Sequence, residues 1–214
     1  MKDNLHYLYG LPVYITSINP KSFDKKQIIK TISDNYNKQN IRQHTSTNAY
    51  VTDIHHSLGD ENNKQFKKVN YDKLKDCYIE PIKKYFEFFW LDKKQANFNC
   101  QVVNYTASKH DSFMEPHLHA DCEFSMVHYI SYDKKEHSPT CFQNPYYFYD
   151  LLPNKFKLQN LNEKQSANSW LYDMWKHDIE EDDLIIFPSI LKHFVRNHKS
   201  KKLRITIASN INVL

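Results

Sequence analysis

The stretch "DLIIFPSILKHFVRNHKSKKLRITIASN" (residues 183–210) holds three short β-rich segments separated by polar turns. Segments of the same kind come before it, namely "FNCQVVNYTA" (98–107), "SFMEPHLH" (112–119), "EFSMVHYISY" (123–132) and "TCFQNP" (140–145). Many short strands that follow one another are typical of an antiparallel sandwich or barrel. The predicted fold class is therefore mainly β with flanking helices.

The residues before this β-rich region have a different pattern. Residues 8–18 alternate between apolar and polar side chains in their second half and predict a strand. Residues 22–36 and 71–90 each carry an apolar stripe at helical spacing and predict two helices. Pro81 lies inside the second stripe, so we expect a kink or a restart of that helix.

The chain of 214 residues suits a single domain over residues 1–214. Within it, residues 1–96 are expected to form an N-terminal strand and helical support for a β core over residues 97–214. The core is interrupted by a long aromatic insert at residues 146–181, which contains Trp170 and Trp175. A long excursion between strands is often a lid or a substrate-binding element.

The composition excludes several classes of protein. With only two glycines, the chain cannot build the glycine-rich loops of nucleotide-binding folds or the nucleophile elbow of serine hydrolases. A net charge of +4 is too balanced to indicate nucleic-acid binding. The four cysteines show no CxxC spacing, and neither a signal peptide nor an apolar membrane segment is recognisable, which predicts a cytoplasmic protein.

The stretch "MEPHLHADCEF" (114–124) carries three potential metal ligands at alternate positions: His117, His119 and Asp121. Side chains two apart on a strand point to the same face, so either adjacent pair can bind one metal ion. His193, at the start of a later short strand, is the best candidate for a third ligand. Three protein ligands on one side of a metal leave open positions, as in non-haem Fe(II) oxygenases.

Arg204 and Thr206 share one face of the last predicted strand. An arginine followed two residues later by a hydroxyl can bind a carboxylate, because the guanidinium donates in a bidentate manner and the threonine adds a further hydrogen bond. The sequence thus places a carboxylate clamp eleven residues after His193.

These motifs resemble the 2-oxoglutarate/Fe(II)-dependent oxygenases, in particular a bacterial and phage branch with HxH in place of HxD. The matching segments are "HLH" (117–119), "SMVHYI" (125–130), "FQNP" (142–145), "DLIIFPSILKH" (183–193) and "RITIASN" (204–210). Their order and spacing agree throughout the C-terminal half, and "LYGLPVYITSI" (8–18) is similar to the start of the family.

The resemblance implies a double-stranded β-helix, that is, a cupin-like jelly roll. It implies a hydroxylase that oxidises a substrate C–H bond while 2-oxoglutarate is converted to succinate and CO2. The histidines would hold Fe(II), and Arg204 with Thr206 would bind the distal carboxylate of 2-oxoglutarate. Tyr129, on a neighbouring strand, is expected to hydrogen-bond the same co-substrate or to pack in the core.

The chain departs from the family pattern at two places. His128 stands where the family has tyrosine, and we expect it to alter the pocket. Asp182 or Asp183 stands where the family has a glycine.

The identity of the second metal ligand stays open between two sets. "EPHLH" resembles the "EPHxD" of prolyl hydroxylases, which favours His117, His119 and His193. The alternative set is His119, Asp121 and His193, a literal HxD with a carboxylate ligand.

A different function also fits three histidines, namely a cupin-like metal-binding protein without 2-oxoglutarate turnover. The arginine clamp favours the oxygenase. We expect a small-molecule or peptide substrate and no nucleic-acid or membrane partner. The sequence does not indicate the oligomeric state.

Overall fold

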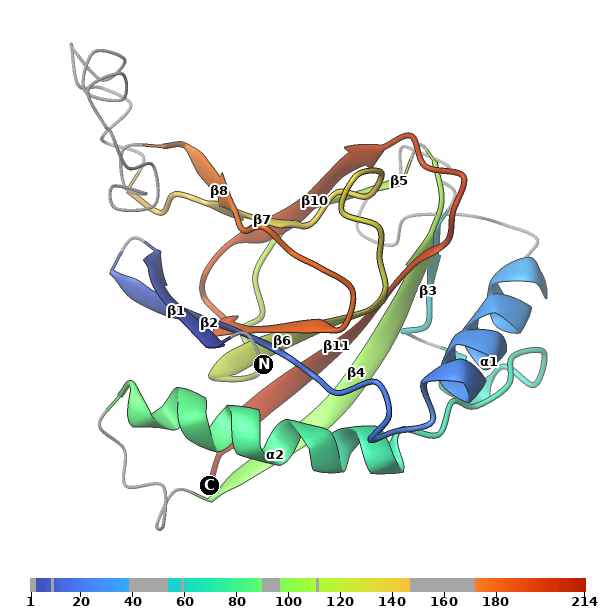
Figure 1. The fold of residues 1–214 in the computed structure, drawn as a ribbon, viewed down its shortest axis with the longest axis horizontal. Coiled ribbons are helices and arrows are strands. Elements are labelled where there is room, and N and C mark those ends of the chain that lie inside the picture. The colour runs from blue at the N-terminus through green and yellow to red at the C-terminus, as the bar shows by residue number, and fades with distance from the viewer. Residues whose placement is uncertain are drawn as a thin grey trace.

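The computed structural model describes most of the chain as two helices, one short 3-10 helix and eleven strands (Figure 1). The residues it describes are 3–8, 10–38, 54–58, 60–89, 97–110, 112–146 and 172–214, with the backbone alone for 3–8 and 61. The described elements form three layers, in which the larger of two sheets lies between the helices and the smaller sheet (Figure 1).

The larger sheet has seven strands, and every neighbouring pair in it is antiparallel. In spatial order the strands are β1 (Asp3–Leu8), β2 (Leu11–Ser17), β9 (Asp183–Pro188), β6 (Phe124–Ser131), β11 (Arg204–Val213), β4 (Phe98–Ser108) and β3 (Ile54–His56). The long central strands β11 and β4 pair along almost their entire length, which makes them the backbone of the fold.

The smaller sheet has four antiparallel strands and faces the larger one (Figure 1). Its spatial order is β5 (Ser112–His117), β10 (His193–His198), β7 (Thr140–Gln143) and β8 (Met174–Lys176). From β4 to β11 the chain passes back and forth between the two sheets, with β7 and β8 as two consecutive strands of the smaller sheet. This is the arrangement of a double-stranded β-helix. The predicted fold class is confirmed.

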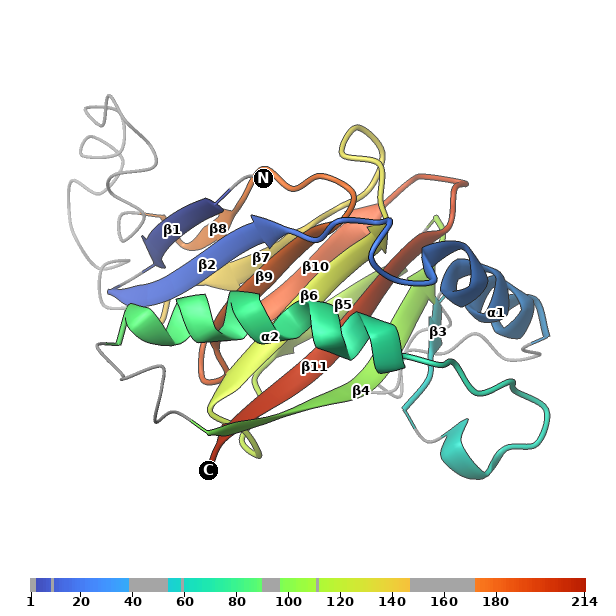
Figure 2. The ribbon, with the colours of Figure 1, turned by 60° about the horizontal axis from the view of Figure 1, so that its bottom comes forward.

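Helices α1 (Lys25–Lys38) and α2 (Asp72–Glu87) cover the outer face of the larger sheet (Figure 2). A 3-10 turn, η1 (Asp60–Asn62), precedes α2. The helices bury an aromatic and isoleucine-rich stripe against the sheet, including Ile28, Ile32, Tyr78, Ile82 and Tyr85. A second cluster, which includes Ile185, Phe187 and Phe142, fills the space between the two sheets. The sheet therefore has an apolar core on each side.

Helix α2 continues through Pro81, so the restart expected there is wrong. A proline removes one backbone hydrogen bond, to the carbonyl of Cys77 four residues earlier. Both residues are only half buried, whereas Leu74, Tyr78, Ile82, Tyr85 and Phe86 on the same helix are buried. Burial of that stripe holds the helix together across the lost bond.

The N-terminal part contributes more sheet than the single strand predicted for it. Residues 8–18 divide into the end of β1 and the whole of β2, joined by a tight turn in which Gly10 has a φ of 79°. This left-handed conformation is one that glycine adopts readily. Strand β3 adds a further edge strand beside β4. Gly10 is the one glycine in residues 8–18, and the sequence pattern there did not reveal that the chain turns at it.

Asp182 occupies the left-handed region of backbone space, with a φ of 67°, at the position where the related family has a glycine. Aspartate tolerates this conformation better than most residues. Its N–H donates to the carbonyl of Tyr129 at 2.7 Å, and its carboxylate lies 2.6 Å from the Lys25 ammonium. These contacts hold the turn before β9 without glycine.

The insert predicted at 146–181 is described only at its two ends. Residues 147–171, including Trp170, lie outside the described residues, and so does most of the predicted lid. Residues 174–176 form β8, the edge strand of the smaller sheet. Neither described helix is sufficiently long and apolar to cross a bilayer.

Candidate metal centre

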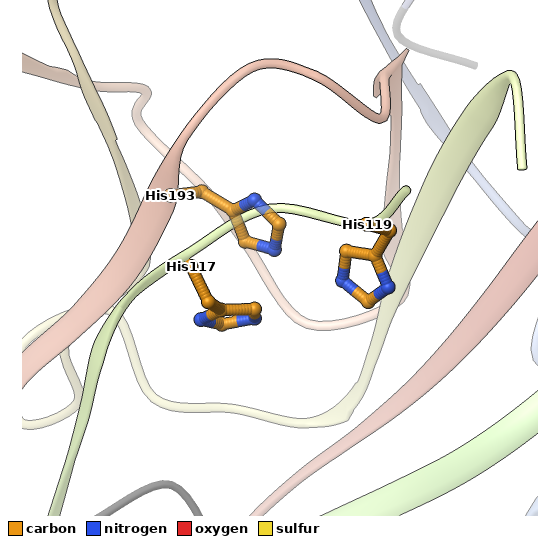
Figure 3. Close-up of side chains that lie close together, drawn as sticks. All are labelled: His117, His119 and His193. Carbon is orange, nitrogen blue, oxygen red and sulfur yellow. The ribbon is translucent and has the colours of Figure 1, made fainter. Parts of the chain in front are cut away.

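Three histidine side chains converge between the two sheets (Figure 3). His117 is the last residue of β5, and it pairs directly with His193, the first residue of β10. His119 follows two residues after the end of β5. One ring nitrogen from each residue lies within 4.8 Å of the others, a spacing at which all three can bind a single metal ion.

The backbone beyond β5 keeps the strand period although it is no longer paired in the sheet. The N–H of His119 donates to the carbonyl of Ser189 at 3.1 Å, which fixes the chain in an extended course past His117. Leu118, between the two histidines, points away and is exposed. His117 and His119, two residues apart, therefore point to the same side of the chain, as the strand period predicts.

Two of the histidines are held in one tautomer. The Nδ1–H of His117 donates to the Glu115 carbonyl at 2.7 Å, and the Nδ1–H of His193 donates to the Leu191 carbonyl at 3.0 Å. A ring that donates from Nδ1 to a carbonyl presents the lone pair of Nε2, and this is the usual second contact of a metal-binding histidine.

The surroundings favour the neutral form of His193 and His119. Burial, with His117 close by, lowers the pKa of His193 to about 3. Burial also lowers the pKa of His119, an effect that His117 reinforces and Asp121 opposes. A neutral imidazole is the form that binds a metal ion, so His119 and His193 favour the form that a metal ion needs.

Asp121 lies outside the histidine cluster in the described part of the chain. Its side chain is exposed and accepts a hydrogen bond from Asn210 Nδ2 at 3.4 Å. Cys122, one residue further, contacts the Ser189 hydroxyl at 3.0 Å. Of the two ligand sets that the sequence left open, the structure brings together His117, His119 and His193.

Arg204 is buried, and its hydrogen-bond and cation–π partners among the described residues, Ser138, Thr206 and Tyr129, are neutral. Its Nε donates to the Ser138 carbonyl at 3.1 Å, its Nη1 lies 3.4 Å from the Thr206 hydroxyl, and its guanidinium lies 5.4 Å from the centre of the Tyr129 ring. No carboxylate among the described residues pairs with it. Burial lowers the pKa of Arg204, which measures the cost of keeping this charge out of water.

The Tyr129 hydroxyl forms its hydrogen bonds with Thr140. The hydroxyl donates to Thr140 Oγ1 at 2.7 Å and accepts from the Thr140 N–H at 2.9 Å. Its ring packs against Arg204 instead, at a distance typical of a cation–π contact. Tyr129 thus holds Thr140 and Arg204 in position, and its expected contact with a co-substrate stays a prediction.

One cavity joins the histidine cluster to the arginine. Its polar wall comes from β3, β4, β6, β7 and β11, and its apolar wall includes Met114, Val127, Phe187 and Val195. The polar residues that line it, besides the three histidines and Arg204, are His56, Asn104, Thr106, Ser125, Thr140, Thr206, Ser209 and Asn210. A dicarboxylate held at Arg204 would therefore extend toward the histidines within a single space.

Sequence reasoning missed several of these polar residues. Asn104 and Thr106 alternate with apolar neighbours along "VVNYTAS" (102–108), so the strand period alone could have assigned them to the cavity. Thr140 carries no such signal, because its place depends on the contact with Tyr129.

The expectation that His128 alters the pocket is wrong. His128 is buried on the helix side of β6, where its Nδ1 shares a hydrogen bond of 3.0 Å with the Tyr78 hydroxyl and its ring packs edge-on against Phe23. The alternation of β6 sends His128 and Tyr129 to opposite faces. Burial, with Lys25 nearby, lowers the pKa of His128 to about 3.

Fold and site together define a metal-dependent enzyme of the double-stranded β-helix type. The sequence profile described as "Putative 2OG-Fe(II) oxygenase" matches residues 103–210, which is half of the chain and contains all three histidines and Arg204. The protein belongs to this family of 2-oxoglutarate- and Fe(II)-dependent oxygenases. No curated protein sequence matches the chain significantly.

Solved structures share the fold at low sequence identity. HygX from Streptomyces hygroscopicus, with nickel, 2-oxoglutarate and hygromycin B bound, aligns with a TM-score of 0.51 and 10% identity over 94% of this chain and 82% of its own. A prolyl hydroxylase from Trichoplax adhaerens, in complex with a hypoxia inducible factor peptide fragment, aligns with a TM-score of 0.50 and 11% identity over 94% of this chain and 82% of its own. A prolyl-4-hydroxylase from Pseudomonas putida gives 0.46 and 12% over 94% and 91%.

Proposed function

We propose that the protein hydroxylates a C–H bond of a peptidyl or small-molecule substrate, with Fe(II) as its metal and 2-oxoglutarate as its co-substrate. Each turnover would consume the substrate, O2 and 2-oxoglutarate, and would release the hydroxylated product, succinate and CO2. The observation that carries this proposal is a buried arginine with no carboxylate partner among the described residues, which lines the same cavity as three convergent histidines.

The arginine supports 2-oxoglutarate because a buried, unpaired cation is costly and serves no purpose in packing alone. An incoming carboxylate would complete the ion pair and accept further hydrogen bonds from Thr206 and its neighbours. Arg204 is pre-organised for this role, since the Ser138 carbonyl and the Tyr129 ring fix its guanidinium before a ligand arrives. A metal-binding protein without a co-substrate has no need of such a clamp.

The histidines support Fe(II) because neutral imidazole nitrogens suit this ion. His117, His119 and His193 are the ligands we propose, with Nε2 as the donor atom of His117 and His193. When bound, the iron would supply positions for the co-substrate and for O2. Three neutral ligands leave the site one charge more positive than a set with a carboxylate, and this strengthens its attraction for a dianionic co-substrate.

The remaining residues of the cavity would exclude water and orient the substrate. Met114, Val127, Phe187 and Val195 make the wall beside the histidines apolar. A dry wall strengthens the interaction between Arg204 and a carboxylate, because the local dielectric is low.

The direct test is succinate formation by purified protein supplied with Fe(II), 2-oxoglutarate and O2, measured by NMR with and without candidate substrates. Slow succinate formation is expected even without a substrate. It should depend on Fe(II) and fall by about 30-fold or more in Arg204→Ala, since truncating one partner of a buried charge pair costs at least about 2 kcal/mol. Arg196→Ala, at an exposed arginine on β10, is the matched control.

Two results would contradict the proposal. If the protein binds Fe(II) but neither binds nor consumes 2-oxoglutarate, it is a cupin-like metal-binding protein. If Arg204→Ala and Arg196→Ala behave alike, the carboxylate clamp is wrong.

A further inference from the structure

Two polar side chains on the wall of the cavity make no hydrogen bond to any described residue. Asn104, on β4, is 7% exposed, and Ser209, on β11, is 1% exposed. The Asn104 Oδ1 and the Ser209 Oγ are both buried without a partner. Both residues line the cavity that holds the histidine cluster.

Buried polar atoms in folded proteins are nearly always hydrogen-bonded, because leaving one unpaired is unfavourable. A valine at either position would fill the same space in a strand without that penalty. Groups of this kind therefore point to a ligand that completes their hydrogen bonds.

The strand register separates these two residues from the arginine clamp. Along β11 the cavity is lined first by Arg204, then by Thr206, Ala208 and Ser209. Asn104 lies directly opposite Ala208 on β4. A shift in the β4–β11 register between Ala208 and Ser209 allows Ser209 to line the cavity beside its neighbour. The cavity thus has a cationic end at Arg204 and a neutral polar end at Asn104 and Ser209.

The charge of the cavity restricts what the neutral end can bind. No aspartate, glutamate or lysine is among the described residues that line it, and Arg204 is its one arginine. A substrate carboxylate would compete for Arg204 with the co-substrate, and a substrate ammonium would find no carboxylate. The carboxamide of Asn104 has an acceptor and a donor group side by side, which matches a second amide with two parallel hydrogen bonds.

We propose that Asn104 and Ser209 bind an uncharged amide group of the substrate, and that the substrate class is peptides or amino-acid amides. This inference rests on the proposed function, because it assigns Arg204 to the co-substrate. The Asn104 carboxamide pairs with the substrate amide, and the Ser209 hydroxyl provides a further hydrogen bond to the same group.

The first test measures binding to protein loaded with Ni(II) and 2-oxoglutarate, a combination that prevents turnover. The probes are N-acetyl amino-acid amides, the corresponding free amino acids, and sugars or polyols, each assayed by saturation-transfer NMR. Neutral amides should bind, while free amino acids and polyols should bind at least tenfold more weakly. Asn104→Leu and Ser209→Ala should each weaken amide binding about tenfold, the loss expected of one strong hydrogen bond.

Asn99→Leu provides the matched control, because Asn99 is an exposed asparagine on the same strand. It should leave amide binding unchanged. The affinity for 2-oxoglutarate, titrated separately, should stay within about twofold in all three variants, since none of them touches the cationic end of the cavity.

A second test measures stability and does not depend on the metal. Removing an unpaired buried hydroxyl should stabilise the folded protein, so Ser209→Ala should raise the Tm of the metal-free protein by about 2 °C. A fall in Tm would mean that the hydroxyl supports the fold, and it would overturn the role given to Ser209.

The outcomes separate the two proposals. If wild-type protein does not bind 2-oxoglutarate, the proposed function fails. If 2-oxoglutarate binds but Asn104→Leu weakens its binding while amide binding is unchanged, Asn104 belongs to the co-substrate site and the inference is overturned. Absence of binding by every amide probe, or preferential binding of polyols, also overturns it.

Discussion

The two faces of the larger sheet are built from the same strands but differ in the side chains that they bury, because the helix face is apolar and aromatic whereas the cavity face is largely polar. On β11, Ile205, Ile207 and Ile211 pack under the helices, while Arg204 and Thr206 point into the cavity. On the helix face the buried Tyr85 hydroxyl donates to the Pro12 carbonyl at 3.0 Å, and the buried Nε2 of His128 lacks a partner among the described residues. On the cavity face an arginine lacks a carboxylate, and two polar atoms lack any partner among the described residues.

The difference shows how one strand supplies both stability and chemistry. Strand alternation assigns odd-numbered residues of 204–207 to the core and even-numbered ones to the site. Substitutions on the helix face should therefore change the free energy of unfolding, and those on the cavity face should change ligand binding. Substitutions on the two faces can test whether stability and ligand binding are separable in this way.

The largest effect is expected at the metal ligands. His119→Ala should lower metal affinity and 2-oxoglutarate turnover by more than about 100-fold, because even residues that only support a ligand contribute 10- to 100-fold. Metal content, measured by elemental analysis after equilibrium dialysis, checks this.

Asp121→Ala is the control for the same experiment, and it should change metal affinity less than about twofold. His119→Asp, which restores a carboxylate ligand, should retain metal. If instead Asp121→Ala removes the metal and His119→Ala does not, Asp121 is a ligand and His119 is not.

A large effect on the free energy of unfolding is expected on the helix face. Ile207→Ala should reduce the free energy of unfolding by about 2–5 kcal/mol, since it leaves a cavity in a fully buried core. The 2-oxoglutarate affinity of the folded fraction should be unchanged. Urea unfolding and a ligand titration of the same sample measure both quantities.

A substitution at the neighbouring residue Thr206, on the cavity face, should change ligand binding and leave stability almost unchanged. Thr206→Val keeps the volume of the side chain but removes the hydroxyl beside Arg204. We expect about tenfold weaker 2-oxoglutarate binding, the value of one hydrogen bond to a charged group, with little change in urea stability. Similar effects of Ile207→Ala and Thr206→Val on both quantities would show that the two faces are not separable.

The last prediction concerns pH and the buried His128. Its pKa falls from 6.5 to about 3 on folding, so the unfolded chain binds a proton at a higher pH than the folded protein does. The associated stability is present above pH 6.5 and is lost as the pH falls toward 3, by up to about 1.4 kcal/mol per pH unit. His128→Gln should flatten the acid limb of stability against pH. An unchanged acid limb would mean that His128 titrates normally.

Strand and helix positions were predictable because each has its own period. The isoleucine and tyrosine stripes of α1 and α2, and the alternation of "KLRITIASNI" (202–211), correspond directly to burial. The three histidines and Arg204 were recognised because motif spacing reports strand register, which is local. The choice between His119 and Asp121 as the second metal ligand could not be made from motif spacing alone. It depends on the carbonyl of Ser189, in a distant segment of the chain, which accepts a hydrogen bond from the His119 N–H and fixes the position of His119.

What the sequence could not reveal depends on contacts between distant segments. Thr140 reaches the cavity wall because it pairs with Tyr129, and His128 faces the helices because Tyr78 and Phe23 lie there. The unpaired state of Asn104 and Ser209 is visible only when every neighbour is placed. Pro81 shows the same limit, because burial of the remaining stripe outweighs one lost backbone bond.

The central claim is that the histidine cluster and Arg204 together bind Fe(II) and 2-oxoglutarate in one cavity. Calorimetric titration of 2-oxoglutarate into anaerobic, Fe(II)-loaded protein tests it most directly. We predict binding of one equivalent to the wild-type protein, weaker binding without the metal, and a loss of about 30-fold or more in affinity in Arg204→Ala. Fe(II)-loaded protein that binds no 2-oxoglutarate, or binds it equally well without Arg204, would contradict the claim.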